Sequence, residues 1–183
     1  PDIQQHLAVS QKVSIDDLDW AAARAAGLSE RERANLEFFA DVESQTFFYF
    51  LEVAKLQISR DPDLISFLTM WNYEEFFHSH AITRLLRESG VDVAAAGARS
   101  AEVRGTARAK ATVEDWFQRG LAQLAPELFH NLWMTWGATQ ELLTTQAYEE
   151  IAAMTKNPVC AELCRRIAKQ ERRHFAYYYN SAR

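Results

Sequence analysis

Apolar residues recur every three or four positions along most of the chain, which is the repeat of one face of an α-helix. Only six glycines and four prolines interrupt this pattern, and the sequence contains no convincing strand. The pattern therefore predicts an all-α protein in which long helices dominate.

Start and stop residues divide the chain into four long helices and one short helix. The first start is a capping box formed by Ser29 and Glu32. The other three begin at Pro62, Pro126 and Pro158, because proline is favoured in the first helical turn. The predicted long helices are 29–59, 61–88, 126–155 and 157–180, and a short helix, 14–26, is predicted before them.

Short turns join the long helices in pairs. A connection of a few residues makes 29–59 and 61–88 one antiparallel hairpin, and 126–155 and 157–180 a second. The sequence thus predicts a ferritin-like four-helix bundle of two antiparallel hairpins joined by a long crossover, 91–125, with an extra short N-terminal helix. We expect residues 1–183 to form a single domain, with 1–28 as an N-terminal extension.

Both predicted hairpins carry the same arrangement of acidic and imidazole side chains. One glutamate lies on the first helix, and a Glu-x-x-His pair, whose members share a helix face, lies on the second. The residues are Glu43, Glu75 and His78 in the first hairpin, and Glu141, Glu171 and His174 in the second. Chance placement would give about 0.4 Glu-x-x-His pairs in the chain. Two such pairs indicate a metal site rather than ordinary surface residues.

The four glutamates also lie at matched depths in their hairpins. Each is 14 to 17 residues from the turn of its own hairpin. At about 1.5 Å per residue, all four carboxylates would lie about 20–25 Å from those turns. The four glutamates and two histidines are therefore predicted to converge on one place.

Two divalent metal ions would neutralise this set. Four carboxylates beside apolar neighbours such as Phe47 and Phe76 would each cost several kcal/mol if they were left unpaired. Carboxylate oxygens with two imidazoles suit iron or manganese, and the lack of thiolate ligands argues against copper or an iron–sulfur cluster. We expect two iron ions, with manganese as the alternative. One ion would be bound by Glu43, Glu75 and His78 and the other by Glu141, Glu171 and His174, with Glu75 and Glu171 bridging.

The remaining histidines and both cysteines are interpreted as structural or surface residues. His6 and His130 lack partners at helical spacing, and His80 lies two residues after a ligand and so faces away. Cys160 and Cys164 are four residues apart on one helix, where a disulfide is geometrically awkward, so we assign them to packing.

Charge and hydropathy argue against several other classes of protein. The net charge is −5 and there is no long Lys/Arg run, which argues against a nucleic-acid partner and a polybasic membrane patch. No apolar run reaches the roughly 18–20 residues of a membrane span, and the first residues do not resemble a secretory signal. We therefore expect a cytoplasmic protein whose partner is a small molecule or a basic protein.

Three segments resemble the soluble acyl-carrier-protein desaturases, a branch of the ferritin-like di-iron carboxylate proteins. Residues 71–78 (WNYEEFFH) resemble that family's Trp-x-x-Glu-Glu-x-x-His motif, and residues 141–144 (ELLT) resemble its Glu-x-x-Thr. Residues 167–174 (IAKQERRH) resemble its fourth core helix. The resemblance is confined to the four core helices.

The resemblance implies dioxygen activation at a di-iron centre, with an external, ferredoxin-like electron donor and a hydrophobic or acyl-carrier-bound substrate. It assigns Thr144 to proton relay near the oxygen site and Trp71 to electron entry. Two alternatives stay open from the residues alone, namely a bond from Thr144 to the preceding turn and simple core packing by Trp71.

The sequence departs from the family in two respects. Gln170 stands where the family usually has an acidic residue beside the ligand glutamate, a place from which an acid orients an imidazole or takes part in electron delivery. The family's enzymes are also considerably longer than this chain, so dependence on a carrier protein is left open.

Several functions are compatible with the six candidate ligands. The first is an O2-dependent di-iron oxidase that desaturates or hydroxylates a hydrophobic, acyl-type substrate. The alternatives are a ferritin- or bacterioferritin-like ferroxidase, a rubrerythrin-like peroxidase, and a di-iron oxygenase of another reaction type such as aldehyde deformylation or N-oxygenation. A structural bundle without metal is the remaining alternative. We expect a homodimer, whereas a storage protein would form a large hollow assembly.

Overall fold

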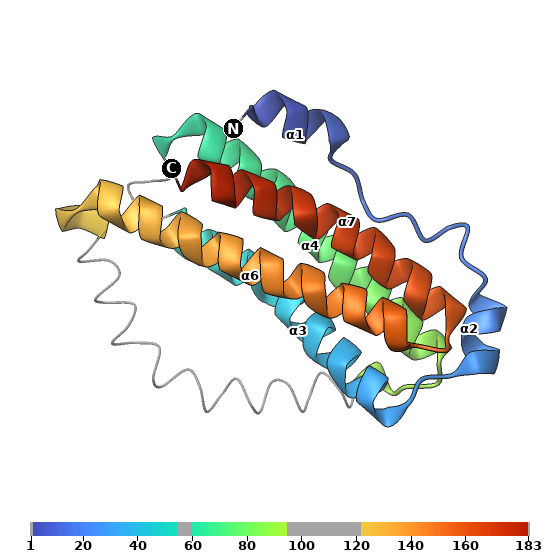
Figure 1. Ribbon diagram of the computed structural model, residues 1–183. Coiled ribbons are helices and arrows are strands. Elements are labelled where there is room, and N and C mark those ends of the chain that lie inside the picture. Colours follow the sequence, from blue (N-terminus) through green and yellow to red (C-terminus); the bar gives the residue numbers. More distant parts are fainter. Residues whose placement is uncertain (1, 55–59, 95–121, 183) are drawn as a thin grey trace.

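The computed structural model describes residues 2–54, 60–94 and 122–182, and these ranges contain α-helices and no strand (Figure 1). The helices are α1 (Ile3–Val9), α2 (Trp20–Ala26), α3 (Glu30–Val53), α4 (Pro62–Glu88), α6 (Pro126–Met154) and α7 (Pro158–Ser181). Within these ranges no helix combines the length and the apolar character that crossing a membrane requires. The predicted all-α class is confirmed.

The starts of the long helices agree with the predicted capping residues. In the capping box, the Ser29 backbone N–H donates to the Glu32 carboxylate at 2.6 Å, and the Glu32 N–H donates to the Ser29 hydroxyl at 3.3 Å. Asp61 and Asn157 cap α4 and α7 through their side-chain oxygens. These caps satisfy N–H groups that have no partner inside the helix.

The N-terminal prediction was partly wrong. The short helix expected over 14–26 begins only at Trp20, because Asp19 and not Ser14 provides the cap. Helix α1, with only 7 residues, was not predicted. Of the expected crossover 91–125, residues 95–121 lie outside the described part of the chain, as do residues 55–59 of the expected first helix.

Packing places the long helices side by side in antiparallel pairs. In the α3–α4 pair, the Ser79 hydroxyl donates to the Ala40 carbonyl at 2.8 Å. Helix α4 packs on α7, where the rings of Phe67 and Tyr177 stack at 3.7 Å. Helices α6 and α7 have the most extensive contact, whereas the backbones of α3 and α6 lie further apart and meet through long side chains, such as the stacked rings of Tyr49 and Trp133 at 5.7 Å. The backbones of the two pairs therefore approach most closely between α4 and α7.

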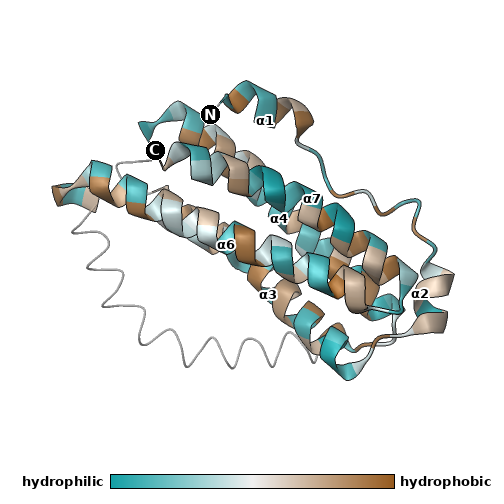
Figure 2. Ribbon diagram, viewed as in Figure 1, coloured by the Kyte–Doolittle hydropathy of each residue, from teal (hydrophilic) through white to brown (hydrophobic). Residues whose placement is uncertain are grey.

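Two apolar clusters fill the interior, and a polar layer separates them. One cluster contains Leu85, Tyr148 and Ile167, and the other contains Phe67 and Met134. Hydrophobic and hydrophilic positions alternate along the long helices (Figure 2), as expected for amphipathic helices. The candidate ligands occupy the layer between the two clusters.

Residues 10–19, which we call the N-terminal strap, connect α1 at one end of the long helices to α2 at the other (Figure 1). Val13 and Leu18 of the strap are buried in one of the apolar clusters. Arg166 of α7 holds the strap by donating to the Ser14 carbonyl at 2.8 Å and to the Asp17 carboxylate at 2.6 Å. The strap is thus fixed to the outer side of α7.

Candidate metal centre

The structure brings all six predicted ligands together in the buried polar layer. Glu43 comes from α3, Glu75 and His78 from α4, Glu141 from α6, and Glu171 and His174 from α7. Each of the six side chains is buried, and both histidines are fully inaccessible to solvent. The matched depths predicted from the sequence therefore correspond to a real convergence of side chains.

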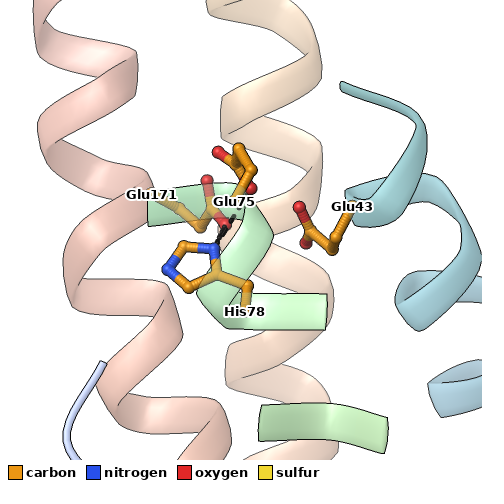
Figure 3. A group of neighbouring side chains, drawn as sticks. All are labelled: Glu43, Glu75, His78 and Glu171. Carbon is orange, nitrogen blue, oxygen red and sulfur yellow. Dashed lines mark hydrogen bonds and ion pairs between the residues drawn. The ribbon is translucent and has the colours of Figure 1, made fainter. Parts of the chain in front are cut away.

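Their ligand atoms form two groups that share two glutamates. We call the group of Glu43, Glu75, His78 and Glu171 the His78 position (Figure 3). The group of Glu75, Glu141, Glu171 and His174 is the His174 position. Within each group the ligand atoms lie within 4.8 Å of one another. Glu75 and Glu171, the residues expected to bridge, are the two that belong to both groups.

The hydrogen bonds of Gln170 fix the orientation of His78. The Gln170 Nε2 donates to the Gln11 backbone carbonyl at 2.8 Å, so the Gln170 Oε1 is the atom that faces His78. His78 Nε2 lies 2.7 Å from this oxygen and must therefore carry a hydrogen. The other ring nitrogen, Nδ1, then points at the carboxylates of Glu75 and Glu171, each 3.1 Å away.

Glu74 fixes His174 in the same manner. Its carboxylate is fully buried and lies 2.8 Å from His174 Nε2, so that nitrogen also carries a hydrogen. Glu74 accepts two further bonds, from the Gln11 backbone N–H at 2.9 Å and from Arg173 at 3.0 Å. His174 Nδ1 faces Glu75 at 3.0 Å. Both histidines thus present Nδ1 to the carboxylate layer, as a pair of metal ligands would.

A cation is needed at each Nδ1, because a bare nitrogen lone pair would repel a carboxylate oxygen at 3.0–3.1 Å. In the metal-free protein this cation is a proton. Burial lowers the pKa of His78, but the charge of Glu75 and the hydrogen bonds to Glu171 and Glu75 outweigh it and raise that pKa to about 10. The pKa of His174 is likewise raised well above its ordinary value, since bonds to four carboxylates outweigh its burial.

Two of the carboxyl groups also hold protons more tightly than usual. Burial and the charge of Glu75 raise the pKa of Glu43, and burial and the charge of Glu171 raise that of Glu141. Protons therefore gather where four carboxylates would otherwise repel one another. A donor set of four carboxylates and two imidazoles in this state is suited to exchange its protons for divalent cations.

Aromatic donors hold the two glutamates that belong to only one group each. The Tyr148 hydroxyl donates to Glu43 Oε1 at 2.6 Å, and Trp71 Nε1 donates to Glu141 Oε1 at 2.9 Å. Trp71 is also 6 % exposed and lies edge-on to Tyr178, so it packs in the core and contacts a candidate ligand at once. The part played by Tyr148 was not predicted.

A cavity of about 220 Å³ lies between α3 and α6 and reaches the carboxylates. Its lining includes the four candidate glutamates, the aromatic residues Tyr49, Trp71, Trp136 and Tyr178, and Thr144. Thr139, five residues earlier, donates its hydroxyl to the carbonyl four residues back at 2.9 Å, but no such bond is found for Thr144 in the described part of the chain. Thr144 is therefore placed at the cavity wall, and the back-bonded alternative is not observed.

Other sequence expectations had mixed outcomes. Phe47 and Phe76, expected beside the ligands, are 50 % and 61 % exposed and lie on outer helix faces instead. His80 is exposed, as predicted, and both cysteines are buried and free. The role of Glu74 was missed, although the sequence contained a signal, because Glu74 and Gln170 occupy the same place before the ligand glutamate in the two Glu-x-x-His pairs.

Comparison of the chain with protein-family models, with curated proteins and with solved structures found no match.

Proposed function

We propose that the chain is a di-iron oxidoreductase that uses dioxygen to desaturate or hydroxylate a hydrophobic, acyl-type substrate. In this proposal the four long helices form a ferritin-like four-helix bundle of the kind found in acyl-carrier-protein desaturases. The observation that carries it is the pair of ligand groups joined by Glu75 and Glu171 and bordered by an aromatic-lined cavity. Neither a buried ion-pair network nor a solvated acidic face would combine these features.

The donor set supports iron, with manganese as the alternative. Carboxylate oxygens and imidazole nitrogens are the ligands that these ions share, and no cysteine among the described residues lies near the groups. Iron bound at both positions would supply the activation and reduction of dioxygen. The stoichiometry of desaturation is balanced when an external donor supplies two electrons and two protons, the substrate loses two hydrogens, and dioxygen becomes two waters.

The residues around the cavity are suited to guide such a reaction. Gln170 and Glu74 hold the two imidazoles in place, and Tyr148 and Trp71 hold the carboxylates of Glu43 and Glu141. The Thr144 hydroxyl at the wall can hold a proton beside the reacting group. The aromatic residues of the lining offer an apolar surface beside the carboxylates, which favours an apolar substrate.

The size of the cavity favours a slender substrate. Its volume, about 220 Å³, lies below the roughly 300–1,000 Å³ of typical small-molecule pockets. A second cavity of about 400 Å³ lies between the same two helices closer to α2, lined in part by Phe38, Phe39 and Met154. The two cavities share no lining residue, so a slender acyl group would bind in the cavity beside the carboxylates. Neither cavity indicates that the substrate must be attached to a carrier protein.

The test begins with metal content. Protein produced with iron should contain about two irons per chain, and a Glu75→Ala/Glu171→Ala variant should contain none. Loaded protein should then be given dioxygen, a ferredoxin-type reductant and acyl thioesters of increasing length. A product that has lost two hydrogens, or gained one oxygen, would support the proposal. A parent protein that cannot be loaded anaerobically with ferrous ion would overturn it.

The near symmetry of the two ligand groups favours a second candidate, an iron-oxidising ferroxidase or a peroxidase. The ferroxidase would consume dioxygen with ferrous ion as its reductant and would retain multiple ferric ions per chain in a large hollow assembly. The peroxidase would reduce peroxide to two waters with two electrons and two protons from an external donor. Neither would need a hydrophobic substrate. The oxidase proposal instead expects a homodimer, in which dioxygen consumption rises when an apolar substrate is added.

A further inference from the structure

The two ligand groups are built on the same plan but have different partners for their histidines. His174 Nε2 donates to the Glu74 carboxylate at 2.8 Å, whereas His78 Nε2 donates to the Gln170 amide oxygen at 2.7 Å. All four side chains are buried, so water does not level this difference. The asymmetry is therefore local to the centre.

The terminal glutamates do not offset the difference. Glu43 accepts a bond from a phenol and Glu141 accepts one from an indole, and both donors are neutral. Arg173 forms an ion pair with Glu74, so the pair has no net charge. At hydrogen-bond distance, however, a carboxylate still polarises an imidazole N–H more strongly than an amide does.

The N-terminal strap matches the same asymmetry. The single residue Gln11 donates its N–H to Glu74 at 2.9 Å and accepts from the Gln170 Nε2 at 2.8 Å through its carbonyl. Its backbone therefore favours an acceptor at position 74 and a donor at position 170. Exchanging the two side chains would place an amide N–H near the Gln11 N–H and a carboxylate near the Gln11 carbonyl. The strap therefore favours glutamate at position 74 and glutamine at position 170.

We propose that the two metal positions are unequal, with the His174 position binding a divalent cation more tightly and filling first. The inference rests on the proposed metal centre. A carboxylate behind a metal-bound imidazole makes that imidazole a stronger donor, and loss of such a partner typically weakens metal binding about 10–100-fold. At limiting metal the protein then holds one ion per chain, at the His174 position.

A calorimetric titration of the protein with ferrous ion, carried out without oxygen, tests the proposal. The parent should show two binding steps that differ in affinity about 10-fold or more. Glu141→Gln should remove the tighter step and Glu43→Gln the weaker one. Glu74→Gln should weaken only the tighter step, and Gln170→Glu should strengthen only the weaker step, so that either change brings the two affinities together.

The exchange variant, Glu74→Gln/Gln170→Glu, provides the sharpest outcome. In that background the order should reverse, so that Glu43→Gln now removes the tighter step. The exposed Glu127→Gln has the same charge change as Glu74→Gln and should leave both steps unaltered. The melting temperature of each metal-free variant shows whether its fold is retained. Glu74→Gln tests the proposal by itself if a glutamate at position 170, which faces the Gln11 carbonyl, prevents folding.

The inference would be overturned if the parent bound both ions with equal affinity. It would also be overturned if none of these substitutions changed the difference between the two affinities. Either result would leave the proposed metal centre intact. Absence of any ferrous ion binding by the folded parent would overturn the metal centre and the inference together. The two failures are therefore distinguishable in a single series of titrations.

Discussion

The two sides of the candidate centre are built differently. On the side of α4 and α7, every imidazole nitrogen that points away from the carboxylates has a partner, and the strap fixes those partners from outside. On the side of α3 and α6, the helix backbones lie further apart, side chains such as Tyr49 and Trp133 join them, and the cavity lies between them. Large apolar side chains such as Phe48, Trp136 and Leu143 are exposed on these two helices.

In the proposed metal enzyme, this difference would separate two tasks. A closed side whose two imidazoles are held by hydrogen bonds keeps the candidate ligands in one geometry, because a displaced polar group would be buried without a partner. An open side, where side chains rather than close backbone packing join the helices, would admit a substrate without disturbing those residues. The closed α4–α7 side would therefore determine metal binding, and the open α3–α6 side would determine which substrate is bound.

Metal binding should have the largest effect on stability. Ferrous ion added without oxygen at about 1,000 times its Kd should raise the free energy of unfolding by about 4 kcal/mol. Differential scanning calorimetry with and without a chelator measures this change. Glu75→Gln/Glu171→Gln, which removes two carboxylates from both positions, should show no response to the metal. An equal response in that variant would place metal binding elsewhere in the molecule.

The junction of α2 with α7 offers a matched pair of caps to test the closed side. Asn157 caps α7 and also donates to the carbonyls of Ala23 and Gly27 at 3.1 and 2.8 Å, whereas Asp61 caps α4 alone. Asn157→Ala should cost about 2–4 kcal/mol of unfolding free energy, and Asp61→Ala about 1 kcal/mol. Denaturant titration measures both.

Asn157→Ser serves as the control for this pair, because serine keeps a capping oxygen and removes the two donated bonds. Its cost should fall between those of the two alanine variants. Equal costs for Asn157→Ala and Asp61→Ala would mean that the bonds to α2 contribute nothing to the closed side.

The floor of the cavity depends on a close approach between α6 and α7. A Cβ added at Gly137 would lie 2.5 Å from the Tyr178 ring, which is itself buried. Gly137→Ala should therefore destabilise the fold by about 1–3 kcal/mol, although alanine is the better helix former. Thr139→Ala, at an exposed position on the same helix, is the control and should be neutral or stabilising. A stabilised Gly137→Ala would show that Tyr178 moves freely and that the floor is not tightly packed.

The sequence predicted the convergence of the six candidate ligands better than the groups that bond to them. The six residues follow helical spacing and equal depth, which are properties of regular elements. Gln11 and Tyr148 lie 63 and 105 residues from the carboxylates they bond, so their partners depend on how segments pack in three dimensions. Helix α1 was missed because 7 residues are too few to show a periodic pattern. The cavity depends on the separation of α3 and α6, which no local pattern encodes.

The smallest effect is expected where the strap meets α7. Hydrogen bonds from Arg166, with a smaller contribution from its charge, lower the pKa of Asp17 to about 2 from 3.8. A lowered folded-state pKa means that the pair stabilises the fold above about pH 4 and that this contribution is lost as the pH falls towards 2. The carboxylate is exposed, so the effect should be small. Denaturant titrations should show Asp17→Asn less stable than the parent at pH 5 and equal to it near pH 2. A difference that persists unchanged at pH 2 would mean that the strap is held by the apolar contacts of Val13 and Leu18 and by the bond to the Ser14 carbonyl rather than by this ion pair.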